Sequence, residues 1–371
     1  MAWERRGEFV GEDEPGVFRF RHVLIRDAAY EGLPFRRRRE LHRRVAERIE
    51  RTGGGELAEL LSLHFFNAEQ YEKAWRYSRV AGERAEAKYA LADAGDLYRR
   101  ALEAARHLPA VSPIELAAAH EALGDVRDRV GLYEEAARAY RNARRLVAGD
   151  PLAEATLLLK ESRIRERLGK YRQALAWVTR GHRVLGHVEG QEALARRAQL
   201  SAWYAAIRQG QGRYHEVIRW GRRAIEEAEA SGEREALAHA LFIMDWAYVD
   251  LGQLDQATNS PRALEIYEEL GDLGTAATVL NNMGMFEYFR GRWDHAAELY
   301  DRGRKLRLRI GDTVDAAMGT TNIGEILSDQ GRLEEAKAMF ADALRVATAE
   351  GRHRDQHEQL GARSLPSSSA R

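Results

Sequence analysis

The sequence predicts an all-α fold built from repeated helix hairpins. Three observations predict it: a turn pattern that recurs about every 40 residues, helical patterns with paired bulky and small residues around the turns, and only 7 prolines among 371 residues. With 44% apolar and 31% charged residues, the chain has the material for amphipathic helices. A recurrence of this length is the signature of stacked units, each of which buries its apolar face against its neighbours.

Six glycines mark the turns. Each is followed two residues later by an aromatic residue or leucine, and five residues later by alanine or valine. These glycines are Gly131, Gly169, Gly212, Gly252, Gly291 and Gly331. Their successive separations are 38, 43, 40, 39 and 40 residues. Because glycine accepts the left-handed conformation that ends a helix, we expect one helix to end at each glycine and another to begin just after it.

The helices on either side of a turn carry complementary residues. Upstream lies an apolar residue followed by glycine, as in Met283-Gly284, and downstream come a bulky and a small residue, as in Tyr300 and Gly303. Small residues let two antiparallel helices approach, while bulky ones fill the adjoining space. A degenerate copy of the pattern, with Ala81-Gly82 and Tyr98, precedes the six turns.

This L-G…Y…G-x-Y-x-x-A…F/Y…A pattern resembles the tetratricopeptide repeat. The resemblance implies a right-handed superhelical solenoid of tetratricopeptide-type helix hairpins, whose first helices line a concave groove. A period near 40 is similar to the long-helix subtype of bacterial signalling ATPases and some animal polarity adaptors. We expect an array of about seven repeats over residues 53–350. The expected repeats are 75–108, 117–150, 155–188, 198–231, 238–271, 277–310 and 317–350.

One repeat is irregular. After Ala257 the sequence reads Thr-Asn-Ser-Pro-Arg, and the next small residue, Ala263, comes one position early. Proline suits the first helical position behind an Asn or Ser cap, so we expect the second helix to restart at Pro261. Two interpretations remain open, a hinge or shaped groove and a tolerated deletion, of which the sequence favours the deletion.

The first fifty residues differ from the repeats. A short alternating strand at 17–20 precedes the stretch 22–34 and a basic helix from about Phe35 to Arg51. The string F-x-F-R-H-x-L-I-R-D-A-A-Y-x-x-L-P resembles the end of the winged-helix module in signalling ATPases of the AAA/STAND type. In bacterial regulators of that family an adenylate/guanylate cyclase domain and an ATPase precede the repeats. The resemblance implies a winged-helix-like remnant over residues 1–52, and that both ends of the chain are cuts through a longer architecture.

Several function classes lose support from what the sequence lacks. There is no G-x-x-x-x-G-K-[ST] motif, and Gly53-Gly54-Gly55 is followed by Glu56 instead of the phosphate-binding lysine. The chain contains no cysteine, and 58 basic residues balance 58 acidic ones. We therefore expect no catalytic activity, cofactor or metal, and no membrane or nucleic-acid partner. With no secretory signal, a cytoplasmic location is expected.

Two charged features were weighed against this expectation. The run Arg36 to Arg39 can grip phosphates, but Leu41, Val45 and Ile49 form an apolar stripe, which favours the solvated face of an amphipathic helix. His353 and His357 have a metal-chelating spacing. They fall in a polar stretch, residues 351–371, that is expected to be a disordered tail.

The strongest functional signal lies on the first helices of the last three repeats. Counting from Ala238, Ala277 and Ala317 places aromatic, amide and acidic residues on the expected groove. The candidate binding residues are Phe242, Trp246, Asn281, Asn282, Met285, Tyr288, Phe289, Asn322, Glu325 and Asp329. Aromatic residues on a solvated face are typical of peptide-binding surfaces, and Asn282 and Asn322 match in register and can hold a peptide backbone. The alternative is that Trp246 and Phe289 are ordinary core residues.

We therefore expect a non-catalytic scaffold for protein interaction or ligand sensing, the regulatory C-terminal part of a signalling ATPase or nucleotide cyclase-type regulator. The expected partner is a protein or peptide in the concave groove, with a small-molecule inducer as a second kind of ligand. One alternative is a chain classed with the adenylate/guanylate cyclases or ATPases by descent but without their catalytic domains. A further alternative is a fragment of a transcriptional regulator.

Overall fold

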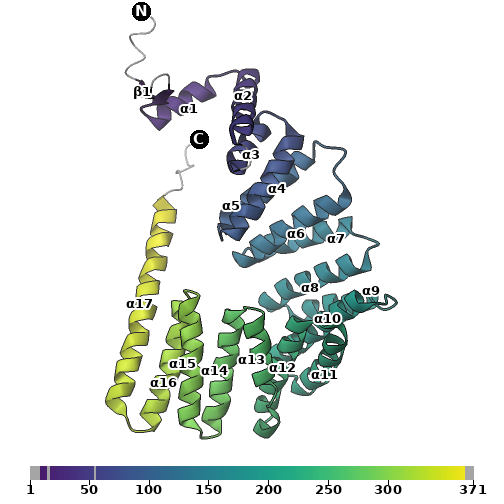
Figure 1. Cartoon of the computed structure of the whole chain (residues 1–371), viewed down its shortest axis with the longest axis vertical. Coiled ribbons are helices and arrows are strands. Elements are labelled where there is room, and N and C mark those ends of the chain that lie inside the picture. The colour runs from purple at the N-terminus through teal and green to yellow at the C-terminus, as the bar shows by residue number, and fades with distance from the viewer. Residues whose placement is uncertain (1–8, 15–16, 54–55, 364–371) are drawn as a thin grey trace, which may run out of the picture. The chain divides into compact units, whose positions relative to one another are not determined.

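The computed structural model describes residues 9–14, 17–53 and 56–363, and their side chains as far as residue 349 apart from residues 12–18. Within these residues the chain forms an antiparallel hairpin of two strands, β1 (Val10–Glu14) and β2 (Val17–Phe20), followed by seventeen α-helices (Figure 1). The predicted all-α repeat fold is confirmed. The strand predicted at 17–20 is present, and β1 is a partner strand that the sequence did not reveal.

The chain divides into two compact units, residues 1–168 and 169–371. The helices of the first unit are α1 (Val23–Glu31), α2 (Phe35–Gly53), α3 (Ala58–Asn67), α4 (Tyr71–Ala87), α5 (Leu91–Ala105), α6 (Pro113–Arg129), α7 (Tyr133–Leu146) and α8 (Pro151–Arg167). The helices of the second unit are α9 (Tyr171–Val184), α10 (Gln191–Gly210), α11 (Tyr214–Ser231), α12 (Arg234–Asp250), α13 (Ser260–Glu269), α14 (Leu273–Phe289), α15 (Trp293–Arg309), α16 (Thr313–Asp329) and α17 (Leu333–Arg363), with a short 3-10 helix, η2 (Leu254–Gln256), before α13. The division falls between α8 and α9, inside the repeat expected at 155–188.

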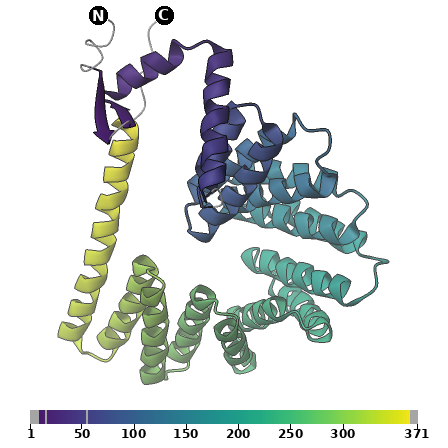
Figure 2. The same ribbon diagram turned by 45° about the horizontal axis from the view of Figure 1, so that its top comes forward.

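Helices that are consecutive in the chain pack as neighbours within each unit, as two views of the ribbon show (Figures 1 and 2). The predicted repeats correspond to seven helix pairs, from α4 with α5 to α16 with α17, and their first helices begin four to seven residues earlier than expected. All six predicted turn glycines have positive φ, between 68° and 79°. The turn prediction is therefore confirmed.

Glycine and an aromatic ring meet inside most of these pairs. A Cβ atom added to Gly124 on α6 would lie 2.4 Å from the ring of Tyr140 on α7, and one on Gly284 would lie 2.8 Å from Tyr300. The ring therefore occupies the space that a side chain at the glycine would need. In these hairpins the contact confirms the predicted pairing of small and bulky residues.

Helix α2 belongs to the helical stack, which differs from the domain boundary expected at residue 52. Its Ala46 is fully buried in one core with Leu61 and Phe65 of α3 and Trp75 of α4. By contrast, all nine residues of α1 are described and none is buried. The continuous core thus begins with α2, because the apolar side of this basic helix packs on α3.

The arginines of α2 form ion pairs on its solvated side. Arg43 binds Glu40 and Glu47 at 3.0 and 2.9 Å, and Arg44 binds Glu40 at 2.6 Å. Within the run itself, Arg36, Arg37 and Arg39 are exposed and Arg39 binds Glu69 at 2.8 Å, which favours the solvated-face interpretation. The buried stripe is displaced from the predicted one, however, since Val45 is exposed and Ala46 takes the central position.

The irregular repeat closes around a buried carboxylate. Asp245 on α12 is fully buried and accepts hydrogen bonds from the backbone N–H and hydroxyl of Ser260, at 2.6 and 2.8 Å, and from the Asn259 amide at 2.7 Å. These donors lie at the N-terminus of α13, where Pro261 occupies the first turn, as predicted. Arg290 of α14 donates to the carbonyl groups of Leu254 and Ala257 in the connecting loop. The loop is held on two sides, which favours a tolerated deletion over a hinge.

The C-terminal helix is longer than the sequence suggested. The structure continues α17 to Arg363, so residues 351–363 are helical where a disordered tail was expected, and residues 364–371 lie outside the described residues. Five of these thirteen residues are arginine or glutamine, which are good helix formers, and the next proline along the chain is Pro366. Helix propensity therefore extends α17 beyond residue 350, where the repeat pattern ends.

We predict that Asp245→Ala lowers the free energy of unfolding by about 3 kcal/mol, because it removes a buried acceptor and leaves the Ser260 donors without a partner. Urea unfolding followed by circular dichroism measures the change. Asp255→Ala, which alters an exposed aspartate in the same loop, is the control and should be nearly neutral. A loss of less than about 1 kcal/mol in Asp245→Ala would contradict the structural role.

We also predict that amides in residues 317–350 exchange with solvent faster than those in 277–310. The last hairpin exposes large apolar side chains, among them Met318 at 57% and Leu344 at 67%, so fewer apolar contacts oppose its local opening. Hydrogen exchange followed by mass spectrometry compares the two segments. Equal protection would show that the hairpin is as well anchored as its neighbour.

Candidate functional site

The predicted site residues lie on α12, α14 and α16, the first helices of three consecutive hairpins in the second unit. We call the first helix of each hairpin its A helix. Eight of the ten are at least partly exposed, with Trp246 at 37% and Phe289 at 59%. These eight form what we call the A-helix face: Trp246, Asn281, Met285, Tyr288, Phe289, Asn322, Glu325 and Asp329.

Phe242 and Asn282 do not belong to this face. Phe242 is only 7% exposed and packs in the core of the second unit, with its ring centroid 6.1 Å from that of Trp246. Asn282 is 8% exposed, one residue beyond Asn281 on α14. A step of one residue turns a helical side chain by about 100°, and here that step carries the amide into the packing between hairpins.

Hydrogen bonds join α14 to α16 across the A-helix face. The Asn322 amide donates to the Asn281 side-chain oxygen at 2.8 Å, and two turns further along, the Tyr288 hydroxyl donates to the Asp329 carboxylate. This bond to Asp329 raises the pKa of the Tyr288 hydroxyl. The Tyr288 ring meets Phe289 edge-on, with centroids 5.8 Å apart. The A-helix face thus presents amide, aromatic and acidic groups, and hydrogen bonds between them link α14 to α16.

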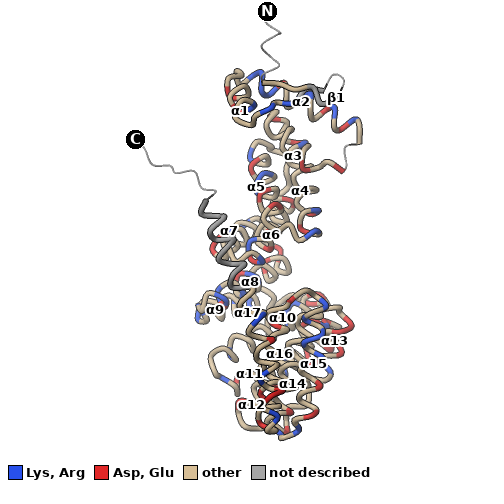
Figure 3. The backbone as a smooth tube through the Cα atoms, turned by 90° about the vertical axis from the view of Figure 1, so that its left-hand side faces the viewer, with Lys and Arg blue, Asp and Glu red and all other residues tan. Residues whose placement is uncertain are grey.

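The A helices of the first unit are joined by charged pairs instead. Arg129 of α6 binds Glu86 of α4 at 2.9 Å, Arg167 of α8 binds Asp128 of α6, and Lys160 binds Asp125 at 2.7 Å. Basic and acidic residues are both present along this part of the backbone (Figure 3). The sequence analysis missed these partners. Their signal is a pair of opposite charges separated by roughly one repeat length, about 40 residues.

Glu287 holds the end of α14, next to Tyr288. It is 7% exposed and accepts hydrogen bonds from Arg290 at 2.8 Å and from Arg292 at 2.7 Å. These arginine contacts, chiefly that of Arg292, lower the pKa of Glu287 to about 2. Since Arg290 also binds the loop before α13, the same cluster links the irregular repeat to the A-helix face.

Neither a metal centre nor a membrane segment can be assigned in the part of the chain that the structure describes. No group of three or more His, Asp or Glu side chains there is arranged to hold a metal ion. The side chains of His353 and His357 lie outside the described residues. No described helix has the length and apolar character needed to cross a membrane.

Comparison with known proteins agrees with this architecture. Residues 275–349, which cover α14 to α16 and half of α17, match the Tetratricopeptide repeat family. A comparison with curated proteins finds no significant sequence match. The fold is a tetratricopeptide-type helical solenoid.

Three solved structures illustrate the shared fold. The apo form of the quorum sensor NprR from B. thuringiensis has a TM-score of 0.60 at 10% identity, over 87% of this chain and 91% of that one. The apo form of RapI has a TM-score of 0.57 at 12% identity, over 75% and 99%. The Rap conjugation gene regulator of plasmid pLS20, in complex with the Phr* peptide, has a TM-score of 0.53 at 13% identity, over 78% and 76%. At these identities the likeness concerns the fold alone.

The Glu287 cluster predicts acid sensitivity. The pKa of the Glu287 carboxyl is lowered from an ordinary value near 4.5 to about 2. The stability that its ionised form contributes is therefore complete above pH 4.5 and is lost as the pH falls towards 2. The full shift corresponds to about 3 kcal/mol. Urea unfolding at several pH values between 2 and 6 measures this loss.

Glu287→Gln is the matched variant, because it keeps the shape of the side chain and removes its charge. We expect it to be less stable than the parent chain near neutral pH and to flatten the pH dependence in this window. An unchanged slope in the variant would show that other carboxylates cause the acid sensitivity.

Proposed function

We propose that the chain is a non-catalytic scaffold that binds a peptide, or an extended segment of a partner protein, on the A-helix face. The observation that carries the proposal is the exposure of Trp246, Phe289 and the half-buried Tyr288 on consecutive A helices. Large aromatic side chains that stay exposed beside polar groups are where protein interfaces concentrate their binding energy. Glu325 and Asp329 border them and favour a partner with a basic residue at that end.

The amide pair on this face supports an extended peptide. Asn281 and Asn322 are joined by one hydrogen bond, and each carboxamide has further donor or acceptor capacity. A peptide backbone can use this capacity through its own N–H and C=O groups. The pair proposed for this role is Asn281 with Asn322, in place of the Asn282 and Asn322 expected from the sequence, because Asn282 is buried.

A similar fold has been solved with a peptide bound. The pLS20 conjugation gene regulator carries the Phr* peptide, and its fold is similar to that of this chain. That likeness supports a peptide as the kind of ligand for this chain. A small-molecule inducer is the second kind of ligand in the proposal.

The wider setting is proposed from the N-terminal residues. Their resemblance to the end of a winged-helix module supports a role as the regulatory C-terminal part of a cytoplasmic signalling ATPase or nucleotide cyclase-type regulator. The β1–β2 hairpin followed by α1 agrees with a strand and helix of such a module. In this role, occupancy of the A-helix face would change the packing of successive hairpins.

The test is a peptide selected from a random displayed library on the purified chain. We predict that Trp246→Ala weakens the selected peptide by about 2 kcal/mol or more, roughly thirtyfold in Kd, as measured by calorimetry. The free energy of unfolding should fall much less in Trp246→Ala than the roughly 3–5 kcal/mol that removal of a buried tryptophan costs.

Trp177→Ala is the control, because Trp177 lies on α9, a second helix of a hairpin, away from the A-helix face. It should leave the peptide affinity unchanged. Failure to select any peptide would count against the proposal. So would a large loss of thermal stability in Trp246→Ala with unchanged binding, since Trp246 would then be core.

A further inference from the structure

A small cavity lined by both polar and apolar residues lies where α14, α15 and α16 meet. Its volume is about 250 Å³, and its lining includes Asn281 and Asn282 from α14, Arg304 and Arg307 from α15, and Asp315 from α16. Asn281 also belongs to the A-helix face, so the cavity adjoins that face. The volume is below the range of about 300–1,000 Å³ typical of small-molecule sites and suits a single side chain.

The cavity replaces an apolar core. One repeat earlier, at the junction of α12, α13 and α14, six of the positions that correspond to its lining are filled by buried apolar side chains. The replaced residues pair as Phe242 with Asn281, Ile243 with Asn282, Ala263 with Gly303, Leu264 with Arg304, Tyr267 with Arg307, and Val279 with Gly319. Six apolar positions thus become polar or glycine in the next repeat. The change creates a hollow in the wall of the solenoid where its neighbour is tightly packed.

The two glycines bring the helices close beside this hollow. A Cβ atom at Gly303 would lie 3.2 Å from the carbonyl oxygen of Ala277, and one at Gly319 would lie 3.1 Å from Cβ of Arg304. The helices are therefore in contact at these points, and the hollow between them is bounded by backbone. A cavity bounded in this way is part of the fold rather than a gap at a loose joint.

Asn282, one of the residues that line the cavity, carries an unused hydrogen-bond donor. Its side chain is more than nine-tenths buried, and its amide nitrogen has no hydrogen-bond partner in the described part of the chain. A buried donor without a partner lowers stability, and an apolar residue in its place would avoid this cost, as Ile243 does one repeat earlier. A bound acceptor would satisfy the amide.

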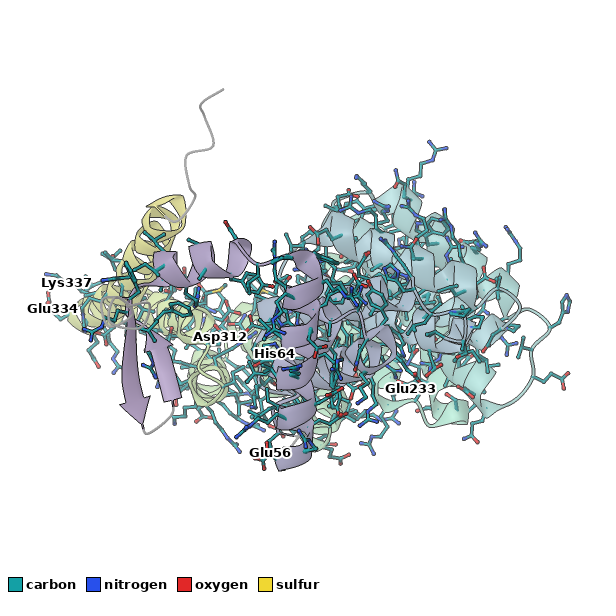
Figure 4. The ribbon with its side chains drawn as sticks, turned by 90° about the horizontal axis from the view of Figure 1, so that it is seen from above. Glu56, His64, Glu233, Asp312, Glu334 and Lys337 are labelled. Atoms are coloured by element: carbon teal, nitrogen blue, oxygen red, sulfur yellow. The ribbon has the colours of Figure 1, made fainter. Side chains whose placement is uncertain are left out.

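The charges around the cavity are already paired. Arg307 binds Asp312, labelled in Figure 4, at 2.9 Å and Asp315 at 3.3 Å, and Arg304 binds Asp301 at 2.5 Å. Lys305 also binds Asp301, at 2.6 Å. Three cationic groups thus balance three carboxylates, and these six groups carry no net charge that would attract an anionic ligand. The groups left for a ligand are the Asn282 donor, a second lone pair on the Asn281 oxygen, and the outer lone pairs of Asp315.

We propose that this cavity receives the carboxamide of a glutamine or asparagine side chain from a peptide on the A-helix face, an inference that rests on the proposed function. The ligand's C=O accepts from Asn282, and its NH₂ group donates to Asn281 or Asp315. A carboxylate of the same size lacks the NH₂ donors and meets Asp315 with like charge. The cavity therefore binds a glutamine side chain in preference to a glutamate side chain.

A small probe tests this pocket apart from the rest of the face. N-acetyl-glutamine methylamide and its glutamate counterpart are titrated at neutral pH into the purified chain, with the side-chain amide signal of Asn282 followed by NMR. We expect the glutamine probe to shift that signal and to bind about tenfold tighter than the glutamate probe. Equal or tighter binding of the glutamate probe, or no binding of either, overturns the proposal.

Asn282→Leu separates a binding role from a structural one. We expect it to weaken the glutamine probe about tenfold and to raise Tm by about 2 °C, since it replaces an unpaired buried donor. Asn67→Leu is the control, because it makes the same substitution in the first unit at an amide that donates to the Leu63 carbonyl at 2.9 Å. It should leave the affinity for the probe unchanged and should not raise Tm. Unchanged affinity in Asn282→Leu overturns the assignment.

The outcomes distinguish this inference from the proposed function. Trp246→Ala should leave the affinity of the free probe unchanged, because Trp246 does not line the cavity. If the glutamine probe does not bind while selected peptides bind through Trp246, the carboxamide pocket is refuted and the peptide-binding face is not. A probe that binds while no peptide can be selected refutes the peptide-binding face and leaves a carboxamide pocket.

Discussion

The contact between a glycine on the A helix and an aromatic ring on the next helix determines how four of the seven hairpins close. It occurs where the two residues are 16 positions apart, at Gly82 and Tyr98, Gly124 and Tyr140, Gly284 and Tyr300, and Gly324 and Phe340. The ring takes the space of the missing side chain, so the two helices are held at one separation and one rotation. That rotation decides which side of α14 faces the neighbouring helix, and therefore that Tyr288 and Phe289 remain on the A-helix face.

The irregular repeat shows what replaces this contact when it is lost. Asp245 stands where the glycine would be and Ser260 where the ring would be, and the pair closes the hairpin through buried hydrogen bonds. A carboxylate in this position is stable only because its donors are held at the start of α13. Arg290 and Glu287 then tie the same loop to the end of α14. The deviation from the repeat pattern is thus connected to the residues that position Tyr288.

The exposed aromatic residues of the candidate site were accessible to sequence reasoning, whereas the buried ones were not. Counting along the helix places Trp246 and Phe289 on the exposed face, where the structure has them. The same counting fails for Phe242, because whether a large apolar side chain lies in the core depends on the neighbouring helices. It fails for Asn282 as well, since a single residue separates the face from the packing between hairpins. The cavity beside Asn282 is formed by three helices, and no one helix signals it.

The helix hairpins, their turns and their order can be predicted from the sequence alone, because each depends on residues close together in the chain. A glycine at a turn, an Asn-Ser-Pro start and an apolar period all act within a few residues. Only the tertiary structure decided the division into two units between α8 and α9, where Gly169 and Tyr171 look like any other turn. It also decided the inclusion of α2 in the helical core and the replacement of an apolar junction by a cavity with a partly polar lining. These features arise from packing between separate helices, where the fit of side-chain volumes outweighs the pattern of any single segment.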